Sequence, residues 1–508
     1  MAPGPTPRAL IFGIDGGSLD LIAPLIDAGR LPVLAGLLRS CAHGPTTTTW
    51  PAHTAPGWAT FVTGRRPGGH GVYQFFDTQE PGYRDRLVGT GDYGCGVVWE
   101  WLARQGLSTG IINVPMSHPP RDLPGYQITW PLAQTLRFSR PATLLGEMAR
   151  AGAGFRPDIT TMFQGDHAYF DLAVDNVRAR GRSVEYLMRE HPADVVMAVV
   201  TEVDRICHHY WHFCDHGHPR YEPPARDEWA TAVAAVYEEV DAMLGDLLAL
   251  VDDDTRVMVV SDHGFGPGRH HVAVNRVLAE AGLLATRPGA PNGEASWFHE
   301  DGRVVDWSRT RAYMPTPHSY AVNLNLAGRQ DSGVVRPGDA GRVRDEVTEL
   351  LGGLRAPDTG ERIFAEILPR EVAYPGPMTA AAPDLLLVPA DQGVLASPNI
   401  TGPVWRPSEQ TGMHRYEGMW AYRSPALSPG RRDTPVALAD LVPTLLHDLG
   451  LSHPAGIDGR PLPELYDAAP PVPFLPEDDD RPAAPDDEVR LLAEDDATAR
   501  TLSAMGYL

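Results

Sequence analysis

Lysine is absent from this chain of 508 residues, so all 43 of its basic side chains are arginines. The absence excludes a Schiff-base lysine and a Walker-type phosphate loop. Cysteine is scarce, because four cysteines with no CxxC pair are too few for a disulfide framework. The N-terminal stretch lacks the apolar core of a signal peptide, and no apolar run approaches the roughly 20 residues that cross a bilayer. We therefore expect a soluble, cytoplasmic protein that does not enter a membrane.

Acidic residues outnumber basic ones, which gives a formal net charge of -22. A negative surface argues against nucleic acid polymers or anionic membranes as partners. If the substrate is itself an anion, bound cations could reverse the field locally. The chain length predicts either two or three domains, or one large α/β domain with insertions.

Apolar runs that end in carboxylates and imidazoles are the most informative pattern. Three runs typical of strands buried on both faces occupy Ala9–Ile14, Asp194–Val200 and Val257–Val260. Asp15 follows the first run, Asp204 and His208 follow the second, and Asp262 and His263 follow the third. Ligands bind beyond the carboxyl ends of parallel strands, so we expect these side chains to meet at one edge. Carboxylates and imidazoles are the groups that hold a divalent metal.

Thr54 opens the stretch TAPGWATFVTG, in which a Thr followed by Pro two residues later predicts the N-terminus of a helix. That end of a helix favours an anion. The threonine is either only a helix cap or a nucleophile. Two metals about 4 Å apart could clamp a displacement at phosphorus, and a metal-bound hydroxyl would lose its proton more readily. His414, in the loop TGMHRYEGMW, supplies a further ligand of the right type.

Together these stretches resemble the type I phosphodiesterase/nucleotide pyrophosphatase family of the alkaline phosphatase superfamily. The matching sequences are FGIDGG, TAPGWATFVTG followed by PGGHGV, the D-x-x-x-H of Asp204 to His208, SDHGFG, GMHRYEG, and DLVPTLLHDLGL followed by IDGRPL. The resemblance implies an α/β fold, with a mostly parallel central sheet, helices on both of its faces, and inserted cap regions.

The resemblance also implies two divalent metal ions, expected to be zinc. One site would comprise Asp15, Thr54, Asp262 and His263, and the other Asp204, His208 and His414. Thr54 would attack phosphorus and form a phospho-threonine intermediate, which water would then release. The substrate would be a small-molecule phosphoester.

Shifts in composition divide the expected catalytic core into three parts. Residues 1–120, 190–285 and 380–465 are assigned to the core, 121–189 and 286–379 to inserted cap regions, and 466–508 to an acidic, Pro-rich linker and a C-terminal helix.

One departure from the family pattern affects the expected substrate. Nucleotide pyrophosphatases of this family have an asparagine where this chain has Phe75. Phe75, Tyr73 and Trp58 could form an apolar wall for a substrate group, or could simply pack in the core. From the family resemblance as a whole, we expect a hydrolase of phosphate esters, in the first place diesters.

The alternatives are a phosphomonoesterase, phosphonate hydrolase or phosphotransferase acting on a small metabolite, and a metal-stabilised binding protein without catalysis. A sulfatase is disfavoured because the chain has no C-x-P-x-R stretch.

Overall fold

A mostly parallel sheet forms the centre of the larger lobe in this computed structural model, which describes residues 6–83, 86–130, 137–157, 168–287 and 304–464. The strand order is β20-β2-β19-β9-β1-β8-β5-β6-β7, and β21 pairs with β2. In that order, the strands span Gly430–Arg431, Ala42–Thr47, Glu417–Arg423, Arg256–Val260, Ala9–Ile14, Val195–Val200, Thr109–Ile112, Gly125–Ile128 and Ser139–Arg140, with β21 at Val436–Ala437. Strands β9, β1, β8, β5 and β6 run parallel, whereas β19 is antiparallel to both β9 and β2.

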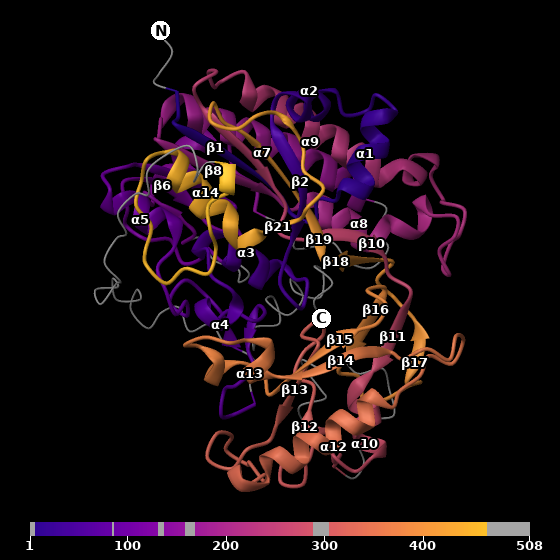
Figure 1. The fold of residues 1–508 in the computed structure, drawn as a ribbon. Coiled ribbons are helices and arrows are strands. Elements are labelled where there is room, and N and C mark those ends of the chain that lie inside the picture. The colour runs from indigo at the N-terminus through magenta and orange to yellow at the C-terminus, as the bar shows by residue number, and fades with distance from the viewer. Residues whose placement is uncertain (1–5, 84–85, 131–136, 158–167, 288–303, 465–508) are drawn as a thin grey trace.

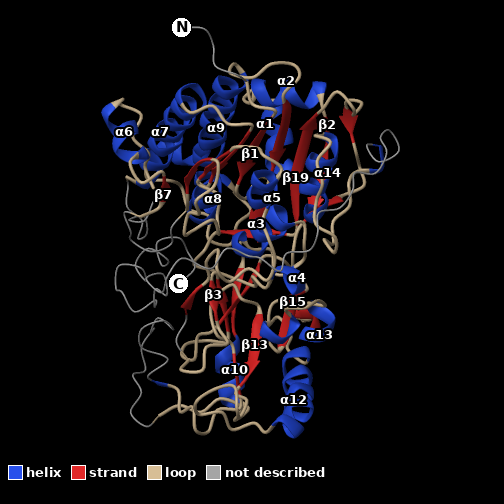
Figure 2. Ribbon diagram, turned by 90° about the vertical axis from the view of Figure 1, so that its left-hand side faces the viewer, coloured by secondary structure: helices blue, strands red, loops and turns tan. Residues whose placement is uncertain are grey.

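Helices cover both faces of this sheet (Figure 2). Leu10, Phe12 and Ile14 of β1 belong to one buried apolar cluster, and Ala9 and Ile11 to the other, because successive side chains of a strand point to opposite faces. The first cluster contains residues of α1 (Leu19–Asp27), α2 (Pro32–Ser40), α6 (Leu144–Arg150), α7 (Tyr169–Glu190), α8 (Glu202–Cys214) and α9 (Ala232–Leu248). The second contains residues of α3 (Thr54–Thr63), α5 (Val98–Arg104) and α14 (Leu441–Asp448). The expected α/β fold is confirmed.

A smaller lobe lies below the central sheet in Figure 1 and has its own apolar core. One of its sheets has the order β12-β13-β15-β14, and a second has the order β16-β11-β17. These strands span Ala312–Tyr313, Ala321–Leu324, Leu385–Pro389, Phe364–Pro369, Val394–Ser397, His270–Ala273 and Trp405–Pro407, respectively. Helices α10 (Val274–Glu280), α12 (Ala340–Gly352) and α13 (Arg370–Ala373) accompany them.

The lobes divide the chain differently from the boundaries expected from composition. Residues 125–140 supply β6 and β7 to the edge of the central sheet, and α7 packs against α9, so the described part of 121–189 is not an insertion outside the sheet. β6 reads GYQI and has no run of branched apolar residues, which is why the pattern missed it.

The smaller lobe is also longer than the expected insertion 286–379. It includes β11, β15, β16 and β17, which the composition had placed in the core. An apolar run such as β15 shows that a strand is buried, but not which sheet it joins. The linker and helix expected at 466–508 lie outside the described residues.

Among the described residues, no single helix has both the length and the apolar composition needed to span a membrane. Helices α1 and α2 together meet that test only as a pair bent by 106°.

Candidate metal centre

The carboxyl ends of β1, β8 and β9 meet at one edge of the central sheet and bring their acidic residues together. Asp15 directly follows β1, Asp204 lies in the first turn of α8 after β8, and Asp262 and His263 follow β9. His414 is contributed by β18 (Gly412–Arg415), which pairs antiparallel with β10 (Gly264–Pro267). The hairpin-like pair β10–β18 therefore carries His414 to strand ends from which it is distant in sequence.

The cluster of candidate ligands has two halves. The first consists of one carboxylate and two imidazole rings, those of Asp204, His208 and His414. His414 Nε2 lies 3.1 Å from Asp204 Oδ1 and 3.0 Å from His208 Nε2. His208 Nε2 lies 3.4 Å from Asp204 Oδ1, as expected for residues one turn apart on α8. These are the three residues that the sequence assigned to one metal.

The other half surrounds His263 and Thr54. His263 Nε2 lies 3.3 Å from Asp262 Oδ2, 3.6 Å from Asp15 Oδ1 and 3.3 Å from Thr54 Oγ1. Thr54 Oγ1 is also 3.3 Å from Asp15 Oδ1. These four residues form the other predicted set. The halves are continuous, because the rings of His263 and His414 stack at 3.8 Å and His263 Nε2 is 4.0 Å from Asp204 Oδ1.

Each histidine of the cluster has its second ring nitrogen against a backbone carbonyl. Nδ1 lies 2.9 Å from Gly412 O in His208, 3.1 Å from Gly264 O in His263, and 2.9 Å from Ala52 O in His414. A carbonyl oxygen can only accept, so Nδ1 carries the proton and Nε2 presents a lone pair to the cluster. Two such lone pairs face each other at 3.0 Å between His208 and His414, an arrangement that a cation between them would stabilise.

Three buried carboxylates, those of Asp15, Asp204 and Asp262, share this space, and the Arg205 guanidinium donates to one of them, Asp204. Burial and the charges of Asp15 and Asp204 raise the pKa of Asp262 well above its usual value. Asp262 Oδ2 accepts no hydrogen bond from the described residues. Lone pairs, clustered carboxylates and an unsatisfied buried oxygen all fit divalent cations.

Thr54 is the first residue of α3, not its cap. His53 is the N-cap, and its Nδ1 accepts a hydrogen bond of 3.1 Å from the Ala55 N–H. No sequence pattern marks His53 as a cap, because the usual capping residues are Ser, Thr, Asp and Asn. With the cap supplied by its neighbour, the Thr54 hydroxyl is turned to the cluster instead of to its own helix.

Two buried donors hold the outer oxygens of the carboxylates. Trp58 Nε1 donates to Asp15 Oδ2 at 2.9 Å, and an Arg205 guanidinium N–H donates to Asp204 Oδ2 at 2.8 Å. Both side chains are at most 1% exposed. They fix the carboxylates with Asp15 Oδ1 and Asp204 Oδ1 toward the histidines.

A comparison with protein-family profiles matches residues 9–417 to type I phosphodiesterase/nucleotide pyrophosphatase. The chain belongs to this family. It is a phosphoric ester hydrolase of the alkaline phosphatase superfamily, a metal-dependent group of enzymes. The matched range includes all seven cluster residues, so the family identity and the cluster concern the same part of the chain.

Two solved structures with TM-scores above 0.5 share the fold of this chain. Phosphonoacetate hydrolase from Sinorhizobium meliloti 1021, in complex with phosphonoacetate, has a TM-score of 0.51 and 14% identity, covering 86% of this chain and 95% of that one. Wild-type alkaline phosphatase PafA has a TM-score of 0.54 and 11% identity, covering 91% and 99%. Murine ectonucleotide pyrophosphatase/phosphodiesterase 5 has a TM-score of 0.48 and 13% identity, covering 88% and 95%. No curated protein sequence matches the chain.

Trp58, Tyr73 and Phe75, the three aromatic residues considered for a substrate wall in this phosphodiesterase-family chain, lie in three separate environments. Trp58 is fully buried beneath Asp15, so it does not form a substrate wall. Tyr73 packs against Tyr374 of the smaller lobe and donates to Met378 O at 2.7 Å. Phe75 lies edge-on to the ring of His53 at 4.7 Å, and it is the one of the three that borders the Thr54 end of the cluster.

A small cleft opens beside His414, between the two lobes. Its lining residues are Trp50, Ala52, His318, Tyr320, Pro389, Gln392, Met413 and His414. His318 and Tyr320 both have left-handed backbones, with φ of 58° and 46°. Strained residues of this kind gather at functional sites, but no sequence pattern predicted them.

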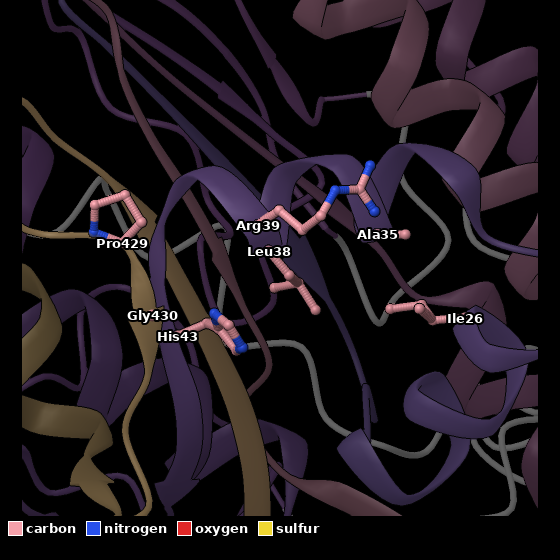
Figure 3. Close-up of a pocket in the computed structure, with 7 residues that line it drawn as sticks. All are labelled: Ile26, Ala35, Leu38, Arg39, His43, Pro429 and Gly430. Atoms are coloured by element: carbon pink, nitrogen blue, oxygen red, sulfur yellow. The ribbon is translucent and has the colours of Figure 1, made fainter.

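A second hollow, lined by parts of α1 and α2 and by His43, is shown in Figure 3. It lies at the amino end of β2, which runs in the same direction as β9. It is therefore at the opposite edge of the sheet from the candidate metal ligands.

Proposed function

We propose that this protein hydrolyses phosphate diesters through a phospho-threonine intermediate on Thr54, with two zinc ions as cofactors. The observation that carries the proposal is the position of the Thr54 hydroxyl. Its oxygen lies 3.3 Å from both Asp15 Oδ1 and His263 Nε2, inside a cluster of buried metal-ligand groups.

Two ligand sets would hold the ions: Asp15, Thr54, Asp262 and His263 for one, and Asp204, His208 and His414 for the other. Their mixture of imidazole nitrogens and carboxylate oxygens is typical of zinc. When bound, the two ions would neutralise phosphoryl charge and make the threonine hydroxyl and a water molecule stronger nucleophiles.

The chain itself supplies the positioned nucleophile. Thr54 Oγ1 forms a bond to phosphorus while the bond from phosphorus to the leaving alcohol breaks. The hydroxyl proton has Asp15 Oδ1 as an acceptor 3.3 Å away. The positive end of α3 stabilises negative charge that develops on the phosphoryl group. Water then attacks phosphorus, and the Thr54 hydroxyl is regenerated.

The uncharged cleft beside His414 supports the diester preference. No fixed charge occurs among its eight lining residues, several of which are aromatic or apolar. Arg415 is next in sequence, but its guanidinium donates to the backbone carbonyls of Gln392 and Pro267. Such a lining offers no fixed cation for the additional charge of a monoester dianion.

Replacement of the nucleophile tests the proposal. We expect Thr54→Ala to lower kcat on the order of 10⁴-fold or more, as loss of a covalent nucleophile does, while the metal content persists. Thr54→Ser keeps the hydroxyl and is the matched control. Turnover of Thr54→Ala at the wild-type rate would reject the assignment.

A phosphomonoesterase or phosphonate hydrolase is the second candidate. Phe75 stands where nucleotide pyrophosphatases of the family have asparagine, and one structure with this fold is a phosphonoacetate hydrolase. Rates on bis-p-nitrophenyl phosphate, p-nitrophenyl phosphate and phosphonoacetate separate the candidates. A much faster rate on the monoester or the phosphonate would overturn the diester preference. The cytoplasmic location expected from the sequence stays a prediction.

A further inference from the structure

Gln74 has a buried amide nitrogen without a hydrogen-bond partner. The side chain is 3% exposed, and its Nε2 donates to no acceptor among the described residues. Leaving a buried polar group unsatisfied costs about 1–3 kcal/mol, so a group of this kind calls for an explanation. The other end of the same amide is held, because Gln74 Oε1 accepts a hydrogen bond from the Thr316 hydroxyl.

The Gln74–Thr316 hydrogen bond joins two segments whose neighbouring residues contact the metal cluster or the residue before Thr54. On the core side, the next residue, Phe75, contacts the ring of His53, which directly precedes Thr54. On the side of the smaller lobe, Thr316 lies two residues before His318. The His318 ring is 6.2 Å from that of His208 and 6.1 Å from that of His414.

The loop that carries Thr316 is fixed in a costly conformation. His318 and Tyr320 both adopt left-handed backbones, which are unfavourable for side chains of this size. Three hydrogen bonds hold the loop in place: Ser319 Oγ donates to Thr316 O at 2.7 Å, Tyr320 OH to Val394 O at 2.9 Å, and Leu387 N to Tyr320 O at 2.6 Å. The loop therefore fixes the position of the Thr316 hydroxyl. Because this hydroxyl donates to Gln74 Oε1, the loop also fixes the orientation of the Gln74 amide.

We propose that Gln74 donates its Nε2–H to a non-bridging phosphoryl oxygen of the substrate, and that Thr316 is the residue that positions it. This inference rests on the proposed function, because it presumes a phosphoryl group beside Thr54. Gln74 would supply a neutral donor close to the carboxylates and imidazole lone pairs of the site, in addition to the positive end of α3. A donor of this kind, aimed at developing charge, acts without reorganisation during the reaction.

Gln74→Glu is the sharpest variant, because it keeps the shape and the oxygen that accepts from Thr316 but removes the N–H donor. We expect kcat with bis-p-nitrophenyl phosphate to fall about 10²–10³-fold, the usual loss for one such donor. Binding of inorganic phosphate to the zinc-loaded protein, measured by calorimetry, should weaken at least about tenfold, and both metals should remain. Gln74→Ala should give losses in the same direction.

The control is Gln79→Ala. Gln79 lies five residues along the same segment, but its Nε2, unlike that of Gln74, donates to two acceptors, Asn323 Oδ1 at 3.0 Å and Ala382 O at 3.4 Å. We expect it to keep wild-type phosphate affinity and kcat within about threefold. Thr316→Val removes the hydroxyl and should lower phosphate affinity and kcat, as the Gln74 variants do. Thr316→Ser keeps the hydroxyl and should have both values close to those of the wild type.

Phosphate binding separates this inference from the proposed function. Wild-type phosphate affinity in Gln74→Glu and Gln74→Ala overturns the role of Gln74, even if Thr54→Ala abolishes turnover. Loss of metal from the Gln74 variants also overturns it, because a substrate donor does not hold the ions. A phosphate affinity that falls in these variants supports the role, and it does so independently of the rate on any ester.

Discussion

The hydrogen bond from Trp58 to Asp15 is predicted to contribute to metal affinity, and Trp58→Phe removes it. The indole N–H donates to Asp15 Oδ2 at 2.9 Å in a fully buried position. A hydrogen bond to a charged group contributes about 1.5–3 kcal/mol. Each 1.4 kcal/mol is tenfold in an equilibrium constant, so we expect zinc affinity to fall about 10–100-fold, the range known for partners that orient metal ligands.

Trp420→Phe is a matched control for this variant. Trp420 lies in β19, is 1% exposed, and its indole N–H has no acceptor among the described residues. The substitution removes the same atoms and leaves a comparable space, but breaks no hydrogen bond. The difference between the two variants therefore isolates the contact with Asp15.

Competition with a chelator of known affinity measures the zinc dissociation constant of each variant, and urea unfolding of the metal-free proteins measures their stability. Both variants should lose stability to the cavity, but only Trp58→Phe should lose metal affinity. If the two variants bind zinc equally well, the indole does not orient Asp15 for a metal, and the reasoning about the carboxylate is wrong.

Three further predictions concern the proposed ligands. The raised pKa of Asp262 means that metal-free protein loses stability as pH rises through that pKa, because the native state binds the additional proton below it. Asp262→Asn should remove this decline in urea unfolding of the metal-free protein while zinc binding is lost; an unchanged pH profile would contradict the assignment. Zinc uptake by the wild type should release protons increasingly as pH falls, seen as buffer-dependent heats in calorimetry. His414→Ala should retain one zinc per chain, and elemental analysis that finds two would contradict its role as a ligand.

The strand ends could be predicted from the sequence because their physical signal is local. A branched apolar run shows that a strand is buried on both faces, and the residue after it falls at the carboxyl edge of a parallel sheet. β1, β8 and β9 follow this rule, and Asp15 and Asp262 lie where it places them.

Other parts of the fold depend on contacts between distant segments. β6 has no apolar run and joins the sheet through its pairing with β5. β15 does have such a run, but packs in the smaller lobe against β13 and β14. The apolar content of a strand indicates how buried it is, whereas tertiary packing determines which strand it pairs with.

The environment of the site was less predictable than its ligands. The sequence allows Trp58 either at a substrate wall or in the core. It is buried, because its N–H is more stable against a buried carboxylate than in an apolar wall. His53, Gln74 and Thr316 had no pattern that marked them, because their roles arise from hydrogen bonds between lobes and at a helix cap. Residue type and spacing mark candidate ligands, but not the groups that orient them.

Anomalous diffraction from crystals of the zinc-loaded protein tests the central claim most directly, since it locates metal ions among the side chains. We predict two ions about 4 Å apart, one contacting Asp15, Asp262 and His263 and the other Asp204, His208 and His414, with Thr54 Oγ1 beside the first. Ions bound elsewhere, or a Thr54 hydroxyl remote from both, would contradict a bimetallic centre built around that threonine.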